Sequence, residues 1–189
     1  MSALSNDYTG CSILIYDAVD NHHLCSTVVT DYDKNEMRIQ IEVAPPTLET
    51  GKVCRLLILC TPTPCEYQGR VLSEGTQKTI AMYQGQEKES RGAVRYELNA
   101  PALIEKLICD GQAYPLHTPL KVKLINISKT GVRFRTPNYS LSSGDQFQMR
   151  MKIGVNEKLL IAEVTNHIDK DSTTSEYGCR FLMVSEEDD

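Results

Sequence analysis

The chain has 189 residues, a length that allows one large domain or two small ones. Hydrophobic residues make up 41% and charged residues 24%, a balance that argues against wholesale disorder. No stretch approaches the roughly 18 uninterrupted apolar residues of a membrane span. Residues 1–8 lack the basic region and apolar run of a secretion signal, so we expect a cytoplasmic protein without membrane insertion.

The net charge of -5 is unevenly distributed along the chain. Residues 1–90 carry 7 basic and 12 acidic side chains, whereas residues 91–189 carry 13 of each. Four of the later acids form the terminal run Glu186–Asp189, so the second half has a charge of +4 without that run. This balance favours an anionic partner for the second half. The absence of a Lys/Arg run argues against DNA as that partner.

The first half predicts about six short strands separated by turn residues. The segment Tyr32–Glu36 indicates a hairpin, and Pro45-Pro46 and Thr61–Pro64 end the neighbouring strands. Such spacing is typical of a small barrel or sandwich. The predicted strands are Ser12–Tyr16, Leu24–Asp31, Met37–Val43, Lys52–Cys60, Glu66–Leu72 and Thr79–Gln84.

A polar, charged segment, Gly85–Gly92, indicates a boundary between domains 1–87 and 88–189. The second half is again β-rich, although residues 100–108 are also compatible with a helical turn. Gln146–Ile153 alternates strictly between apolar and polar residues, the pattern of a half-buried strand. We therefore predict an all-β chain of two small barrels. The strands predicted here are Ala93–Leu98, Leu103–Cys109, Pro119–Ile127, Val132–Thr136, Gln146–Ile153, Lys158–His167 and Tyr177–Val184.

Catalytic and metal-binding patterns are absent from the sequence. The seven cysteines form no Cys-x-x-Cys pair, and His22-His23 lies in a polar turn without a third ligand nearby in sequence. No nucleophile elbow, P-loop or paired-carboxylate motif is present. We therefore expect neither an enzyme, nor a metal site, nor a cofactor.

Two arginines, Arg91 and Arg95, lie four residues apart at the domain junction. A guanidinium group can pair with a phosphate, bond the O6/N7 edge of guanine or stack on a base. Gly92 between them allows the backbone to bend. Taken alone, so short a pattern favours two surface arginines that solvate a linker. Tyr96 follows Arg95 closely enough to pack near a bound base.

A second segment, Asn126-Ile-Ser128-Lys-Thr-Gly131, lies at the end of a strand. The side chains of Asn126 and Ser128 can bond nearby backbone or a ligand, and Gly131 is expected to supply a positive φ to the turn. Basic residues surround this segment. Taken alone, it favours a polar β-turn that a glycine closes.

Together the two segments resemble the PilZ domain family, whose motifs are Arg-x-x-x-Arg and (Asp/Asn)-x-Ser-x-x-Gly. The string Leu124–Phe134 is similar to the central signature, and Tyr177–Phe181 is similar to a later strand of the family. The resemblance covers residues 88–184 approximately. It implies a six-stranded antiparallel barrel that binds cyclic di-GMP on its outer surface. More faintly, residues 1–87 resemble the barrel that precedes PilZ in flagellar-brake proteins.

By this resemblance, Arg91 and Arg95 hold guanine edges and phosphates, while Asn126 and Ser128 contact a guanine and the sugar-phosphate backbone. Gly131 keeps the loop low enough for the ligand to approach. Position 126 is Asn where many members carry Asp, and an amide offers guanine only one acceptor oxygen, so weaker affinity is expected.

The expected function is a cyclic di-GMP receptor whose interdomain arrangement changes on binding, in control of motility, exopolysaccharide or biofilm. Its expected partners are the ligand and a protein of the motor, secretion or polysaccharide machinery, with a homodimer left open. The alternative is a PilZ-like interaction scaffold that binds no nucleotide.

Overall fold

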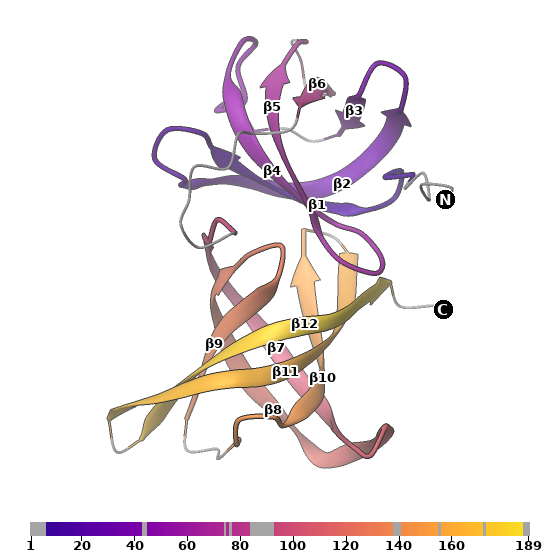
Figure 1. Cartoon of the computed structure of the whole chain (residues 1–189). Helices are drawn as coiled ribbons and strands as arrows, with labels where there is room; N and C mark the ends of the chain where they lie inside the picture. Colours follow the sequence, from indigo (N-terminus) through magenta and orange to yellow (C-terminus); the bar gives the residue numbers. More distant parts are fainter. Residues whose placement is uncertain are drawn as a thin grey trace. The chain divides into compact units, whose positions relative to one another are not determined.

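A computed structural model describes residues 7–42, 45–73, 75, 77–83, 93–137, 141–154, 156–171 and 173–186. All of its regular elements are β-strands, β1 to β12, which form two closed antiparallel barrels (Figure 1). The chain divides into two compact units, one of residues 1–60, 64–88 and 153–156 and one of residues 61–63, 89–152 and 157–189. The predicted boundary segment 85–92 lies outside the described residues.

The first barrel closes in the order β1-β2-β3-β6-β5-β4, with β4 returning to β1. Apolar residues of every strand fill its interior, among them Ile13, Leu56 and Ile80, which are fully buried. Closure removes the exposed strand edges that an open sheet of this size would present. Its strands are β1 (Ser12–Asp17), β2 (His23–Asp33), β3 (Arg38–Ile41), β4 (Val53–Leu59), β5 (Cys65–Val71) and β6 (Lys78–Tyr83).

The second barrel closes in the order β10-β11-β12-β9-β8-β7. Two three-stranded meanders form it, joined where β7 pairs with β10 and where β9 pairs with β12. β8 pairs with β9, and β9 pairs with β12. The turn between β8 and β9 therefore lies beside β12 on the surface of the barrel. Its strands are β7 (Tyr96–Cys109), β8 (Gln112–Ile127), β9 (Gly131–Pro137), β10 (Gln146–Ile153), β11 (Asn156–Asp171) and β12 (Thr174–Glu186).

An aromatic cluster lies at the centre of the second barrel. The ring of Phe134 stacks on Tyr177 at 5.4 Å between centroids and meets Phe147 edge-on at 5.7 Å. The hydroxyl of Tyr177 accepts a hydrogen bond from the Leu141 amide at 3.2 Å, which satisfies its polar end. Tyr96 is also fully buried, so the suggestion that it packs near a surface ligand is wrong.

The all-β prediction is confirmed, and the Gln146–Ile153 strand has the predicted bounds. The predicted strand Leu103–Cys109 is part of β7, which forms a long hairpin with β8, so the helical turn considered for residues 100–108 is wrong. Asp110-Gly111 forms its turn, with φ angles of 50° and 75°. These positive angles are typical of a two-residue hairpin turn.

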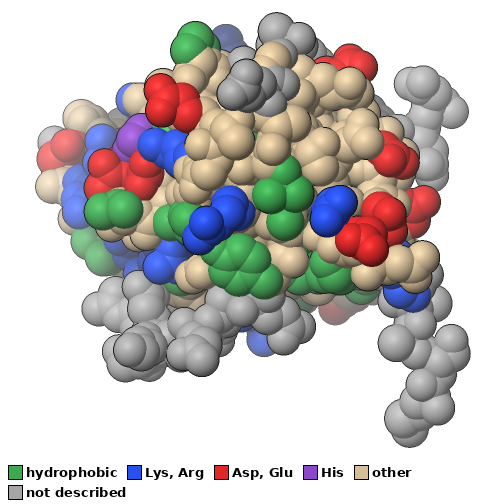
Figure 2. Space-filling view, turned by 90° about the horizontal axis from the view of Figure 1, so that it is seen from above, with side chains coloured by type: hydrophobic (Ala, Val, Ile, Leu, Met, Phe, Trp, Pro, Cys, Tyr) green, Lys and Arg blue, Asp and Glu red, His purple; other side chains and the backbone are tan. Residues whose placement is uncertain are grey.

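No helix among the described residues is long and apolar enough to cross a membrane. Acidic, basic and apolar side chains are interspersed over the face drawn in Figure 2.

Candidate functional site

A groove of about 220 Å³ lies on the outer surface of the second barrel. Four of the five residues predicted from the sequence line it: Arg95, Asn126, Ser128 and Gly131. Arg91, the fifth, lies outside the described residues. The remaining lining residues are Ala93, Thr130, Val132, Arg133, Thr165, Asn166, Gly178, Cys179 and Arg180.

A β-bulge directs Asn126 into the groove. Leu124 of β8 pairs with Phe134 of β9, and Asn126 pairs with the next residue of β9, Arg133, so Ile125 is the extra residue. Strict alternation would put Asn126 on the same face as Leu124, which is fully buried. The bulge changes the phase, and Asn126 turns outward beside Arg133.

The hydroxyl of Ser128 organises the turn that leads from β8 into β9. Its Oγ accepts a hydrogen bond from the Thr130 amide at 3.2 Å and lies 3.2 Å from the Thr130 hydroxyl. The Ser128 amide donates to the carbonyl of Gly131 at 2.8 Å. Ser128 is only 7% exposed, so one wall of the groove is a turn that these hydrogen bonds hold in place.

Gly131 is required by close packing and not by its backbone angles. Its φ is not positive, so the expectation that it supplies a left-handed turn conformation is wrong. A Cβ at this position would overlap the backbone carbonyl of Cys179 on β12. Gly131 pairs with Arg180 of β12. Because Gly131 has no side chain, β9 and β12 can lie close together at the floor of the groove.

Arg180 lies at the rim of the groove and is held by an acidic partner. Its Nη2 donates to Glu163 Oε1 at 2.9 Å, and Gln146 Nε2 donates to Glu163 Oε2 at 3.2 Å. The hydrogen bond from Arg180, with a smaller contribution from Gln146, lowers the pKa of the Glu163 carboxyl. The Arg180 side chain is 59% exposed, so its remaining donors face solvent.

The far side of the groove is formed by Thr165 and Asn166 of β11, to which the sequence analysis assigned no role. The register of β11 against β12 shifts between Val164 and Asn166, and the Thr165 hydroxyl donates to the Gly178 carbonyl at 2.8 Å. Arg133, Gly178 and Arg180 were also assigned no binding role, although Gly178 and Arg180 belong to the string that resembled the PilZ family. Only the pairing of the strands brings them together.

The groove is lined by the guanidinium groups of Arg95, Arg133 and Arg180. It is also lined by the side-chain amides of Asn126 and Asn166. Among the described residues its lining contains no carboxylate. Guanidinium groups pair with phosphates and base edges, and amides offer one donor and one acceptor face. The set therefore suits an anionic ligand that also carries hydrogen-bonding bases.

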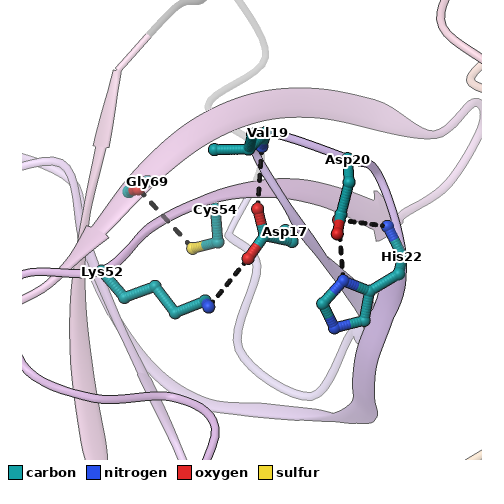
Figure 3. A network of polar contacts seen from close by, with 7 residues as sticks. All are labelled: Asp17, Val19, Asp20, His22, Lys52, Cys54 and Gly69. Atoms are coloured by element: carbon teal, nitrogen blue, oxygen red, sulfur yellow. Dashed lines mark hydrogen bonds and ion pairs between the residues drawn. The ribbon is translucent and has the colours of Figure 1, made fainter.

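A separate polar cluster lies in the first barrel, where Asp17, Asp20 and His22 bring possible metal ligands within 4.8 Å of one another (Figure 3). Asp17 pairs with the Lys52 ammonium at 2.7 Å and accepts the Val19 amide at 2.8 Å. Asp20 contacts His22 Nδ1 at 2.7 Å. Because Lys52 already neutralises Asp17, the geometry is that of a braced turn.

The PilZ domain family matches residues 88–189. No curated protein matches the chain.

Among solved structures, the Bacillus subtilis inhibitor of motility MotI/DgrA is similar over 94% of this chain and 90% of its own, with 11% identity and a TM-score of 0.40. The K. pneumonia MrkH complex with c-di-GMP is similar over 92% and 80%, with 15% identity and a TM-score of 0.38. The Escherichia coli YcgR complex with c-di-GMP is similar over 92% and 76%, with 12% identity and a TM-score of 0.37.

Proposed function

The chain belongs to the PilZ domain family, and we propose that it is a signalling receptor whose second barrel binds cyclic di-GMP in the groove described above. The observation that carries this proposal is the convergence of both family motifs on one surface. Arg95 from the first motif and Asn126, Ser128 and Gly131 from the second line the same groove, although up to 36 residues separate them.

The chemistry of the lining fits the proposed ligand. Cyclic di-GMP carries two phosphodiester charges and two guanines, so it needs cations, base-edge partners and room beside the backbone. Arg95 and Arg91 supply forked cations for the phosphates and for the O6/N7 edges. Asn126 accepts a hydrogen bond from guanine through its single amide oxygen and donates through its nitrogen. Because Gly131 has no side chain, the ligand can approach the backbone of the sheet closely at this position.

The receptor acts by conformational change and not by catalysis in this proposal. On binding, the junction that contains Arg91 and Arg95 closes over the ligand, and the arrangement of the two barrels changes. The ligand drives this change only through its higher affinity for the closed arrangement. The altered surface then engages a protein partner in the control of motility or of exopolysaccharide and biofilm formation. Small-angle scattering with and without ligand measures the arrangement, and identical curves at saturation would refute this step.

Isothermal titration calorimetry with cyclic di-GMP tests binding directly. We expect saturable binding by the parent chain and a loss of at least about tenfold in affinity for Arg95→Ala, because a charge-assisted bond contributes roughly 1.5–3 kcal/mol. Arg150→Ala is a matched control, since Arg150 lies outside the groove, paired with Glu105 at 2.9 Å. Equal affinity of the parent and the Arg95→Ala variant would refute the proposed site.

The alternative of a scaffold without nucleotide binding is favoured by one observation, the amide of Asn126 at a position where many family members carry Asp, which leaves guanine a single acceptor oxygen. A parent chain that binds no cyclic di-GMP at high ligand concentration would establish that alternative.

A further inference from the structure

We infer that Asn166 reads a guanine edge at the end of the groove opposite Asn126. This inference rests on the proposed function, because it assigns a second base contact to the same cyclic dinucleotide site. It adds a specificity-determining residue that lies on β11, outside both sequence motifs.

One row of paired residues crosses the groove from β8 to β11. Asn126 pairs with Arg133, Arg133 pairs with Gly178, and Gly178 pairs with Asn166. Neighbouring strands are about 4.8 Å apart, so the two asparagines lie roughly 14 Å apart along the curved sheet. Asn126 and Asn166 therefore mark the two ends of a row that has Arg133 between them, an arrangement that suits a ligand with two bases and a central charge.

Both asparagines are placed by a β-bulge. On β8 the bulge lies between Leu124 and Asn126, and on β11 it lies between Val164 and Asn166. Leu124 and Val164 are buried, so without the bulge each asparagine would point into the core. Bulges that re-aim a side chain are frequent beside functional sites. Neither side chain makes a hydrogen bond with another described residue, so both amides remain available to a ligand.

Gly178 lets the Asn166 amide lie across the sheet toward Arg133. A Cβ at Gly178 would come within 2.5 Å of Asn166 Oδ1 and 3.1 Å of its Cγ. The φ of Gly178 is not positive, so glycine serves here as space for the asparagine and not as a backbone hinge. The amide thus extends into the groove and does not stand away from it.

The chemistry at position 166 identifies the edge that is read. The Asn166 nitrogen donates to guanine O6 while its oxygen accepts from guanine N1, which uses both faces of the amide. An aspartate at this position has two acceptors and no donor, so it would bond N1 and the exocyclic N2 amino group instead. Asparagine and aspartate therefore differ in whether binding requires the N2 amino group.

The experiment titrates the full chain and its variants with cyclic di-GMP and with cyclic di-inosine monophosphate, which lacks the N2 amino groups. We expect Asn166→Leu, which keeps the shape but not the hydrogen bonds, to weaken cyclic di-GMP binding about 5- to 150-fold, the range for one base contact. Gln148→Leu on β10 is the matched control, because Gln148 does not line the groove. A urea midpoint equal to that of the parent shows that each variant is folded.

The Asn166→Asp variant provides a readout that a purely structural role would not move. We expect the ratio of the inosine to the guanine dissociation constant to rise about fivefold or more over the parent ratio. Charge repulsion between the new carboxylate and the phosphates affects both ligands equally and cancels in this ratio. An unchanged ratio, together with parent-like binding by Asn166→Leu, would overturn the inference alone. A parent chain that binds neither dinucleotide would overturn the proposed function as well.

Discussion

Replacing Gly131 with alanine tests the packing of the groove floor most directly. The new Cβ would overlap the Cys179 carbonyl and lie 3.2 Å from Arg180 Cα, and both atoms belong to backbone that cannot rotate away. β9 and β12 must therefore separate. One hydrogen bond depends on their approach, from the Phe181 amide to the Thr130 carbonyl at 2.9 Å.

The expected cost follows from these contacts. Overpacking of this kind costs about 1–3 kcal/mol, and the weakened backbone hydrogen bond adds about 1 kcal/mol. We therefore expect Gly131→Ala to lower the free energy of unfolding of the second barrel by roughly 2–4 kcal/mol. This is a large share of the 5–15 kcal/mol that is typical of a domain. Cyclic di-GMP binding should weaken in parallel, because the Ser128 turn moves with the strand.

Urea unfolding of the isotope-labelled full chain, followed by amide NMR, separates the two barrels. The resonances of Val132 should lose intensity at a lower urea concentration in the variant, whereas those of Ile13 in the first barrel should not shift their midpoint. Gly178→Ala is the matched control on β12: its Cβ meets the movable end of Asn166, so it should cost less than about 1 kcal/mol. Equal stability of Gly131→Ala and the parent would refute the packing argument.

Three further predictions concern the second barrel. Phe134→Ala should cost about 3–5 kcal/mol in urea unfolding, because the ring is fully buried against two aromatic neighbours; a cost below 1 kcal/mol would contradict this. Burial alone would raise the pKa of Glu176, but the hydrogen bond from Arg135 and the charge of Lys170 leave this pKa below the ordinary glutamate value of 4.5. Because the folded pKa lies below the unfolded one, this stabilisation is present above pH 4.5 and disappears as the pH falls through the lower folded value. Glu176→Gln should therefore be destabilised at pH 7 and approach the parent in acid, and a gap independent of pH would exclude this linkage. Burial raises the pKa of Cys179 to about 12, whereas Cys109 is exposed. A thiol-titrating reagent at pH 8 should lose its fast phase in Cys109→Ser and keep it in Cys179→Ser.

Local patterns were sufficient for the strand content. Gln146–Ile153 alternates perfectly because one face packs in the core and the other meets solvent, and its bounds were predicted correctly. The start of β8, residues 112–118, was missed because both of its faces are largely exposed, so no alternation marks it. The Asp110-Gly111 pair was the available signal, since this dipeptide favours the positive φ angles of a two-residue turn.

The sequence by itself determined the all-β class and located four residues that share one groove: Arg95, Asn126, Ser128 and Gly131. It did so because each motif is contiguous and its turn chemistry is local. Only the tertiary structure decided that Asn126 points outward and that Gly131 is needed for close packing against β12. It also decided that Asn166 and Arg180 lie opposite these residues. Those features depend on bulges and on the register between strands distant along the chain, and a one-residue change in register reverses which face a side chain occupies.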